Sequence, residues 1–300
     1  ASHRAPPAHV PMTPPVLILG CGYTGSRAAA RLAARGIRVL AAGRRADLIP
    51  PHPLIEPVLL DAASCSDLES LLSLIPNGCL LLHSLPVLDD GREITPLILS
   101  VLGPALRRVV YLSTTAVYGA QPEIDEHTPA EPQTPEARLR LAAEQAVLSG
   151  PWSAIVLRPA AIYGPGRGVH VSIPAGRFRM AGAGESWVSR IHVDDLAALA
   201  EAALFSEIRG AWPVADLEPC RQRDIAAFVC SLLGCPMPPS APPESLHRTL
   251  RANRRVDGRA VFRAHGLALQ FPSFREGIPA CLAAEGRLPS PPRAALQSET

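Results

Sequence analysis

The sequence predicts an α/β protein built on a doubly wound, parallel sheet of the Rossmann type. An apolar strand near the start of the chain runs directly into a glycine-rich turn and a helix. Apolar runs then alternate with helical patterns over the first half, which is typical of a parallel sheet covered by helices on both faces. An apolar fraction of 47% over 300 residues is sufficient for one large domain, or for a large domain and a smaller one.

The turn near the start has the residues of a dinucleotide-binding motif. Val16–Leu19 is a continuous apolar run, as in a strand covered on both faces. Gly20, Gly22 and Gly25 follow as G-x-G-x-x-G, and Ser26–Arg35 fits a helix whose N-terminus offers N–H groups to phosphates. The first glycine permits a tight turn, the second lets backbone approach a pyrophosphate, and the third lets the helix approach the sheet. A turn that only connects two elements is the alternative. The predicted cofactor-binding residues here are Gly20, Gly22, Tyr23, Thr24 and Gly25.

The other elements of the sheet alternate along the chain. Strands are predicted over Ile37–Ala42, Pro57–Leu60, Cys79–His83, Arg108–Ser113 and Ala154–Leu157. Helices are predicted over Asp67–Leu74, Thr95–Leu102 and Glu136–Leu148, the last with Thr134 as N-cap and Pro135 at the first helical position. Right-handed crossovers bring the carboxyl ends of parallel strands to one edge, so Asp61, His83 and Thr114 are expected at the ligand edge.

Arg44, just after the second strand, indicates which nicotinamide cofactor is bound. An NAD site usually has Asp or Glu about 20 residues past the glycines, whereas an arginine there suits the 2′-phosphate of NADP. Arg44 lies 19 residues beyond Gly25, and the first acidic residue after Gly25 is Asp47. The sequence therefore favours NADP, with NAD as the other possibility. The alternative is that Arg44 and Arg45 are two solvated arginines.

Asp61 and His83 are further candidates for cofactor contacts, because each ends a strand at the same edge. Asp61 fits a contact with adenine and a cap of the following segment equally well. For His83, a structural or solvent-edge role is expected rather than a catalytic one.

Composition and charge exclude several classes of function. A net charge of +2 with 19% charged residues provides no basic field for nucleic acid. The sequence contains no apolar run of 18 residues, so no membrane span is predicted. The seven cysteines form no C-x-x-C pair and no zinc spacing, so reduced thiols in the cytoplasm are expected. His192, Asp194 and Asp195 suggest a metal, but Asp194 also fits a helix N-cap and further ligands are lacking, so no metal site is predicted.

Five later motifs resemble the extended short-chain dehydrogenase/reductase family, of the NAD(P)-dependent epimerase/dehydratase type. They are Thr114–Gly119 after the fifth strand, Arg158-Pro159 with Ile162–Gly166 after the sixth, Ser189–Leu196, Arg255–Gly258 and Phe271–Phe274. The resemblance spans about Val16 to Leu282. It implies an NADP-dependent oxidoreductase or an epimerase/dehydratase-like enzyme that acts on a small polar or sugar-like molecule. It also implies a small, partly interleaved C-terminal substrate domain.

The chain departs from this family at its catalytic pair, Tyr-x-x-x-Lys. The chain contains no lysine, and its tyrosines are at 23, 111, 118 and 163. Counting back four residues from Glu144 places Arg140 at the lysine position, and four residues further places Glu136 at the tyrosine position. The family's first glycine is also replaced, by Leu19, whereas its catalytic Ser/Thr position is retained as Thr114.

These replacements change what the site can do. Arginine keeps the positive charge and can bind ribose hydroxyls, so Arg140 is a predicted cofactor contact, but its pKa above about 12 rules out proton exchange. To act as an acid, Glu136 would need its pKa raised to near 7, whereas the positive charge of Arg140 one turn away lowers that pKa. A surface i,i+4 pair is the favoured interpretation of these two residues.

The substitutes for the missing pair are Thr114, Tyr118 and Tyr163, which are the predicted catalytic residues. Packing against loops is the alternative role of the two phenols. Two classes of function remain open: an enzyme with an unusual acid–base group, and a catalytically silent NADP(H)-binding sensor or scaffold.

The domain prediction follows from these motifs. We expect a flexible extension over 1–14, a Rossmann domain over 15–165, a small substrate-binding region over 166–285, with 194–215 returning to the core, and a disordered tail over 286–300. Later elements are predicted over Asp194–Phe205, Ala211–Ala215, Arg221–Leu233, Ser245–Leu250, Arg259–His265 and Gly277–Ala284. A small-molecule substrate is the expected partner, and the sequence leaves the oligomeric state undetermined.

Overall fold

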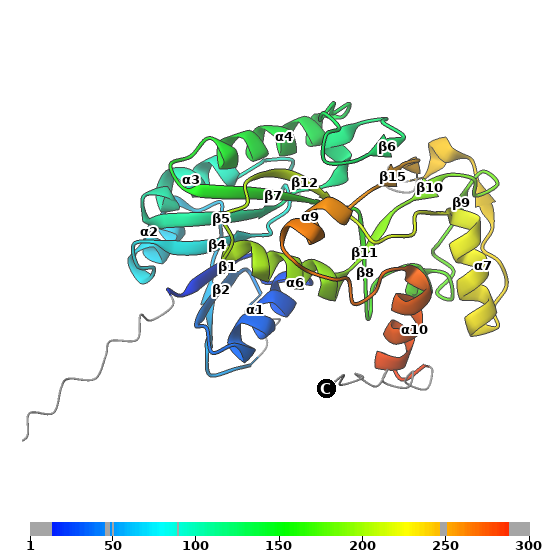
Figure 1. The fold of residues 1–300 in the computed structure, drawn as a ribbon, viewed down its shortest axis with the longest axis horizontal. Helices are drawn as coiled ribbons and strands as arrows, with labels where there is room; N and C mark the ends of the chain where they lie inside the picture. Colours follow the sequence, from blue (N-terminus) through cyan, green and yellow to red (C-terminus); the bar gives the residue numbers. More distant parts are fainter. Residues whose placement is uncertain (1–13, 46–48, 50, 89, 247–250, 288–300) are drawn as a thin grey trace, which may run out of the picture.

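A seven-stranded parallel sheet forms the centre of the molecule (Figure 1). The computed structural model describes residues 14–45, 49, 51–88, 90–246 and 251–287. The strands are β1 (Val16–Leu19), β2 (Val39–Gly43), β3 (Ile55–Leu59), β4 (Cys79–His83), β5 (Leu106–Leu112), β7 (Ser153–Pro159) and β12 (Gly210–Val214). Their order is β3-β2-β1-β4-β5-β7-β12, and every neighbouring pair is parallel. The predicted fold class is confirmed.

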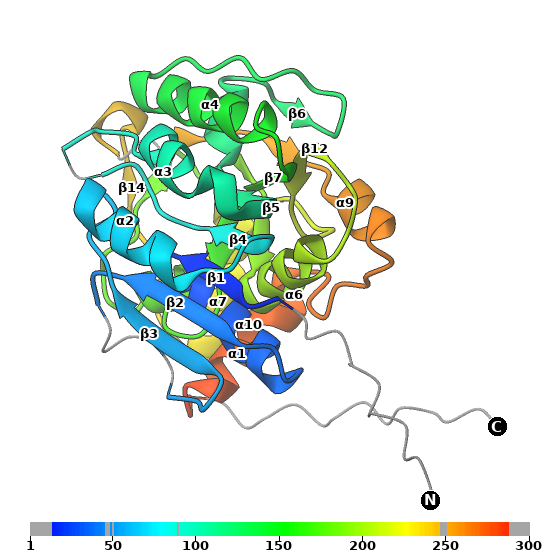
Figure 2. The same cartoon turned by 90° about the vertical axis from the view of Figure 1, so that its left-hand side faces the viewer.

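Helices cover both faces of this sheet (Figures 1 and 2). One face carries α2 (Cys65–Leu74), α3 (Thr95–Leu102) and α4 (Pro135–Leu148). The other carries α1 (Gly25–Ala34), α6 (Val193–Leu204) and α9 (Arg259–Ala264). Neighbouring residues of a strand point to opposite faces. Val16 and Ile18 therefore pack under α1 and α6, whereas Leu17 and Leu19 pack under α2 and α3. Because both faces are covered, the strand must be apolar at every position.

The chain order of the strands places a crevice beside β1. From β1 the chain moves outward through β2 and β3, and then crosses back to β4 on the other side of β1. Connections that leave neighbouring strands in opposite directions open a gap at the carboxyl ends of those strands. The glycine turn after β1 therefore lies where a doubly wound sheet binds its ligand.

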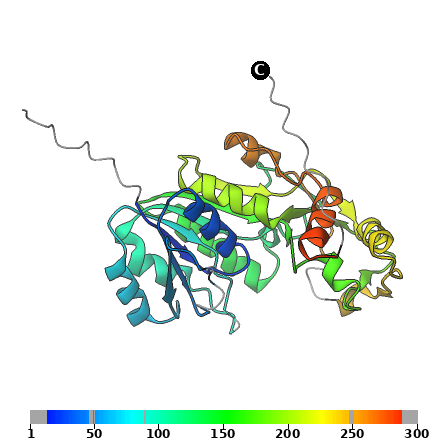
Figure 3. The same ribbon diagram turned by 90° about the horizontal axis from the view of Figure 1, so that it is seen from below.

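A smaller lobe lies beside the sheet (Figures 1 and 3). Its helices α5 (Val169–Ser172), α7 (Gln222–Leu233) and α10 (Phe274–Ala284) share a core of their own, which includes Ile225, Phe274 and Ile278. Short strand pairs hold the remaining segments: β8 (Ala161–Tyr163) with β11 (Arg190–His192), β10 (Trp187–Val188) with β13 (Cys220–Arg221), β9 (Met180–Ala181) with β14 (Ser240–Ala241), and β6 (Glu123–Ile124) with β15 (Arg255–Val256). Strands of two or three residues are too short for a sequence pattern to predict.

One local prediction needs correction. The N-cap of α6 is His192 rather than Asp194, because the His192 Nδ1 atom accepts the Asp194 N–H at 3.2 Å. Most of the helix predicted over Ser245–Leu250 lies outside the described residues, which omit 247–250; Ser245 ends a single 3-10 turn, Pro243–Ser245 (η4). By contrast, Thr134 caps α4 as predicted, accepting the Ala137 N–H at 3.2 Å.

The predicted terminal segments lie mostly outside the described residues, which begin at 14 and end at 287. At the end of that range, Arg287 donates to the carbonyl oxygen of His170 at 3.1 Å, so this part of the predicted tail is bonded to the small lobe. Among the described helices, none combines the length and apolar character that a bilayer crossing requires. All seven cysteines are free thiols. In the described ranges, no group of His, Cys, Asp or Glu side chains is arranged to hold a metal ion.

Candidate functional site

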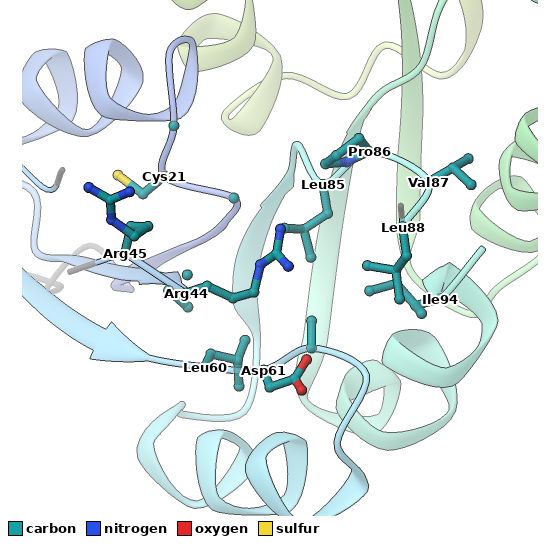
Figure 4. Close-up of a pocket in the computed structure, with 15 residues that line it drawn as sticks. Cys21, Arg44, Arg45, Leu60, Asp61, Leu85, Pro86, Val87, Leu88 and Ile94 are labelled. Atoms are coloured by element: carbon teal, nitrogen blue, oxygen red, sulfur yellow. The ribbon is translucent and has the colours of Figure 1, made fainter. Parts of the chain in front are cut away.

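An open pocket lies at the carboxyl ends of β1, β2, β3 and β4 (Figure 4). Each strand contributes the residues that directly follow it, as expected for the ligand edge of a parallel sheet. The pocket is lined by Gly20, Cys21 and Gly22 after β1, by 42–45 around the end of β2, by 60–62 after β3, and by 85–88 and Ile94 after β4.

The three motif glycines have different structural requirements. Gly20 has φ +87°, and a Cβ there would approach the carbonyl carbon of Ser84 to 3.0 Å. At Gly25, a Cβ would overlap the carbonyl oxygen of Gly20. The fold therefore needs both. At Gly22 a Cβ would meet nothing within 4 Å. Gly22 thus presents open backbone to the pocket, which fits a position that a dinucleotide pyrophosphate must approach closely.

This contrast predicts opposite results for two alanine substitutions. Gly22→Ala is expected to leave the thermal midpoint within about 2 °C of wild type but to weaken nucleotide binding at least about tenfold, because the added methyl blocks only the ligand. Gly25→Ala is expected to lower stability itself, because its methyl collides with backbone. Thermal denaturation and calorimetric titration with NADPH measure both. Tight NADPH binding by Gly22→Ala would exclude a ligand contact at this turn.

Arg44 and Asp61 lie on opposite sides of the pocket. Figure 4 shows the Arg44 side chain crossing from the end of β2 toward Leu85, with the Asp61 carboxylate on the β3 side. A guanidinium in an open pocket can bind a phosphate through two parallel hydrogen bonds. One oxygen of Asp61 accepts the Ala63 N–H at 3.0 Å, so this residue caps its own turn while it lines the pocket. Asp47, the nearest following acid, is outside the described residues.

Tyr23 and Thr24 do not extend their side chains into this pocket. The Tyr23 hydroxyl donates to the carbonyl oxygen of Pro165 at 3.1 Å, and the guanidinium of Arg27 lies 4.2 Å from its ring centre. Burial raises the pKa of Tyr23 to about 12. Thr24 is buried directly before α1. Tyr23 therefore joins the glycine turn to the loop after β8, and neither Tyr23 nor Thr24 is among the residues that line this pocket.

His83 lies beneath the pocket rather than in it, which corrects the prediction of a direct cofactor contact. Its side chain is fully buried, and burial lowers its pKa to about 3, so the ring is neutral. The Nδ1 atom accepts the Leu85 N–H at 3.3 Å. The Nε2 atom lies 2.9 Å from the Thr95 hydroxyl, which itself donates to Glu93 at 2.5 Å. These partners assign the proton to Nε2 and make His83 a support of the Leu85 segment.

Arg140 also holds the Leu85 segment, through its carbonyl oxygen. It is therefore not the exposed member of a surface pair with Glu136 that the sequence favoured. Its side chain is only 12% exposed and donates to Glu93 at 3.3 Å. It also donates to the carbonyl oxygens of Leu85 and Leu112, each at 3.1 Å. The arginine at the family's lysine position therefore binds the chain segments that follow β4 and end β5. Glu93, which joins Arg140 to His83 through Thr95, was not identified from the sequence.

Thr114 is the predicted catalytic residue that lies at the open edge. It follows β5, is partly exposed, and its Oγ1 accepts the Ala116 N–H at 3.2 Å. This bond uses the oxygen and leaves the hydroxyl hydrogen free to donate to a ligand.

The two tyrosine candidates are both enclosed, which argues against their predicted catalytic roles. Tyr118 is 1% exposed beneath Arg158, whose guanidinium lies 4.8 Å from its ring centre. Tyr163 is 3% exposed, and its hydroxyl donates to the carbonyl oxygen of Ser273 at 3.4 Å. Gly277 of α10 packs so closely that any side chain there would overlap the Tyr163 hydroxyl. Burial raises the pKa of both phenols, so neither is prepared to release a proton.

A buried ion pair holds the chain beside Thr114. Glu144 of α4 is 1% exposed and binds Arg158 of β7 at 2.6 Å and 3.1 Å. The Ser113 hydroxyl donates to the same carboxylate at 2.5 Å. The pair thus fixes the end of β5 to α4 and β7, so Thr114 is presented from a rigid support.

Comparisons with known proteins agree with this geometry. A family model described as the NAD dependent epimerase/dehydratase family matches residues 90–210. A solved structure of a conserved protein of unknown function from Silicibacter pomeroyi is 31% identical, with a TM-score of 0.74 over 91% of this chain and 99% of that chain. The chain belongs to the NAD-dependent epimerase/dehydratase family.

Two further relatives extend the comparison. A 3-diazoavenalumate denitrifying reductase from a Streptomyces species is 28% identical over 305 residues, which cover 88% of this chain and 98% of the reductase. A Thermus thermophilus UDP-glucose 4-epimerase, solved with NAD, shares the fold at 23% identity, with a TM-score of 0.73 over 88% of this chain and 96% of that chain. Membership of the epimerase/dehydratase family makes a nicotinamide dinucleotide the cofactor of this chain, and the open backbone at Gly22 fits it.

Two residues of α4 were matched from the sequence to the family's proton-transfer pair. Glu136 and Arg140 stand one helical turn apart on α4, but Arg140 is bonded to the carbonyl oxygens of the pocket wall. An arginine cannot exchange a proton near neutral pH. Arg140 therefore supports the wall of the pocket, and the hydroxyls of Tyr118 and Tyr163 are enclosed.

Proposed function

We propose that this protein is an NADP-dependent reductase for a small polar substrate whose reduction needs no tyrosine as an acid. The observation that carries the cofactor preference is Arg44, which extends into the pocket from the end of β2 (Figure 4). This is where a site of this fold meets the 2′-position of the adenosine ribose, and a guanidinium there suits a phosphate better than a hydroxyl. Asp61 then lies near the adenine side.

The residues near Thr114 limit the reaction type. A bound NADPH supplies a hydride from its nicotinamide ring. Hydride addition to a ketone produces an alkoxide, which needs an acid, and the Tyr118 and Tyr163 hydroxyls are enclosed. A substrate that stabilises the added electron pair itself avoids this need. In an aryl diazonium group, for example, a C–H bond forms, the C–N bond breaks and N₂ leaves, so no proton from the protein is required. The likeness to a denitrifying reductase supports substrates of this kind.

Thr114 then has a binding role. Its free hydroxyl hydrogen donates to the polar atom of the substrate next to the carbon that accepts the hydride. Such a donor stabilises charge that develops in the transition state and costs no reorganisation, because the Ala116 N–H already fixes its oxygen.

Turnover with purified protein tests this proposal. NADPH and NADH are offered with ketones, with conjugated enones and with aryl diazo compounds. We expect NADPH oxidation with an activated class, and we expect Thr114→Val to lower kcat/KM about 10- to 100-fold. Tyr118→Phe and Tyr163→Phe are expected to retain activity within about twofold. Loss of turnover in either phenylalanine variant would identify a tyrosine acid and contradict the proposal.

A catalytically silent NADP(H) sensor or scaffold is the second candidate. It is favoured by Arg140, whose bonds to Leu85 and Leu112 serve the pocket wall instead of a proton relay. The same titrations separate the two. Tight NADPH binding with no turnover of any substrate class favours the sensor.

A further inference from the structure

Arg254 contacts Thr115, in the loop after β5, although the two residues are 139 positions apart in the chain. Its backbone N–H donates to the carbonyl oxygen of Trp187 at 3.0 Å, directly before β15, which pairs with β6. The next N–H, of Arg255, donates to Pro122 at 2.7 Å. From this fixed backbone, the Arg254 guanidinium reaches the loop after β5 and donates to the carbonyl oxygen of Thr115. The charged group therefore contacts the residue that directly follows Thr114 in the chain.

Arg254 differs from the arginines around it in its charge partners. Arg255 pairs with Glu123, Arg259 pairs with Asp257, and Arg221 pairs with Glu185. Within the described ranges, no Asp or Glu forms an ion pair with Arg254. Its side chain is half-buried, and burial lowers its pKa with no carboxylate to offset the shift. A half-buried charge gains from an anion that pairs with it.

The guanidinium also has more donors than its hydrogen bonds to described residues use. It carries five N–H groups in a planar fork, and the bond to the carbonyl oxygen of Thr115 uses one of them. A carboxylate or phosphate can accept two parallel bonds from such a fork and neutralise its charge. An anionic group bound at this point would lie next to the residue that follows Thr114 in the chain.

We propose that Arg254 binds a carboxylate or phosphate group of the substrate and so selects anionic substrates. The assignment rests on the proposed function, because Thr114 marks the place of the reacting part of the substrate. Thr114 would contact the reacting end, and Arg254 would orient the anionic end. Neither the family comparison nor the strand pattern points to this residue.

Binding of small probes tests the assignment. Benzoate, phenyl phosphate and neutral benzamide are titrated into the protein, with and without saturating NADP⁺, by calorimetry. We expect wild type to bind benzoate or phenyl phosphate at least about tenfold more tightly than benzamide. Arg254→Gln should abolish this preference, and Arg254→Lys should retain part of it. The matched control is Arg255→Gln, the exposed neighbour that pairs with Glu123, which should keep the full preference. Whichever of the two anions binds more tightly identifies the chemistry.

Several outcomes would overturn the assignment: no preference in wild type, an intact preference in Arg254→Gln, or an equal loss in Arg255→Gln. NADPH affinity is measured on each variant without probe and should stay within about twofold of wild type. A parallel loss of NADPH affinity in Arg254→Gln would mean that this arginine binds the cofactor. Absence of NADPH binding by wild type would instead remove the proposed function, whereas the probe titration without nucleotide would still decide the role of Arg254.

Discussion

Replacing Arg44 by alanine is expected to weaken NADPH binding about 10- to 100-fold while NADH affinity stays within about twofold. A hydrogen bond to a charged group contributes about 1.5–3 kcal/mol, and each 1.4 kcal/mol corresponds to about a tenfold change in affinity. NADH lacks the 2′-phosphate, so the substitution removes nothing from its binding. Calorimetric titration of both nucleotides measures the difference directly.

The matched control for this prediction is Arg38→Ala. Arg38 directly precedes β2, is 63% exposed in its side chain, and pairs with Glu56 at 3.2 Å, away from the pocket lining. The substitution removes one positive charge from the same strand region, and both affinities should remain unchanged. Equal losses of NADPH and NADH affinity in Arg44→Ala would show that Arg44 supports the pocket without reading the phosphate.

The largest loss of stability is expected from Glu144→Ala. Arg158 is 9% exposed in its side chain, and the substitution would leave its charge buried without a partner. Removing one member of a buried ion pair costs about 3–5 kcal/mol. The Ser113 hydroxyl would lose its acceptor as well. Urea unfolding near neutral pH should show this as a lower midpoint with an unchanged slope.

Two other variants separate the buried charge from a simple loss of contacts. Glu185→Ala removes an exposed carboxylate that pairs with Arg221 and Arg223, and it should cost less than about 1 kcal/mol. The double variant Glu144→Leu/Arg158→Met replaces both charges by apolar groups and should recover much of the loss. If the double variant were less stable than Glu144→Ala, an unpaired charge on Arg158 would not be the cause of the stability that Glu144→Ala loses.

The support beneath the pocket connects stability with function. Arg140, Glu93, Thr95 and His83 form a continuous path of hydrogen bonds that holds Leu85 through both its N–H and its carbonyl oxygen. Leu85 in turn lines the pocket and approaches Gly20. Arg140, which the sequence matches to the family's lysine position, thus supports the wall of this pocket.

The sequence alone determined the sheet, its glycine turn and the edge at which the pocket lies. These features depend on residues close together in the chain. Val16–Leu19 must be apolar because both faces of the strand are covered, and Gly20 must tolerate a positive φ a few positions later. The position of Arg44 after β2 follows from the same local order.

Only the tertiary structure decided what the other candidates contact. Tyr163 lies in a motif that resembles the family, but α10, more than 100 residues later, encloses its hydroxyl. Arg140 was expected to pair along its own helix, yet its bonds go to Glu93, Leu85 and Leu112. The sequence did not identify Arg254, because only the tertiary structure shows that β15 places it against the loop of Thr115. Hydrogen bonds and burial are set by which segments the assembled sheet brings together, and the spacing of residues along the chain does not contain that information.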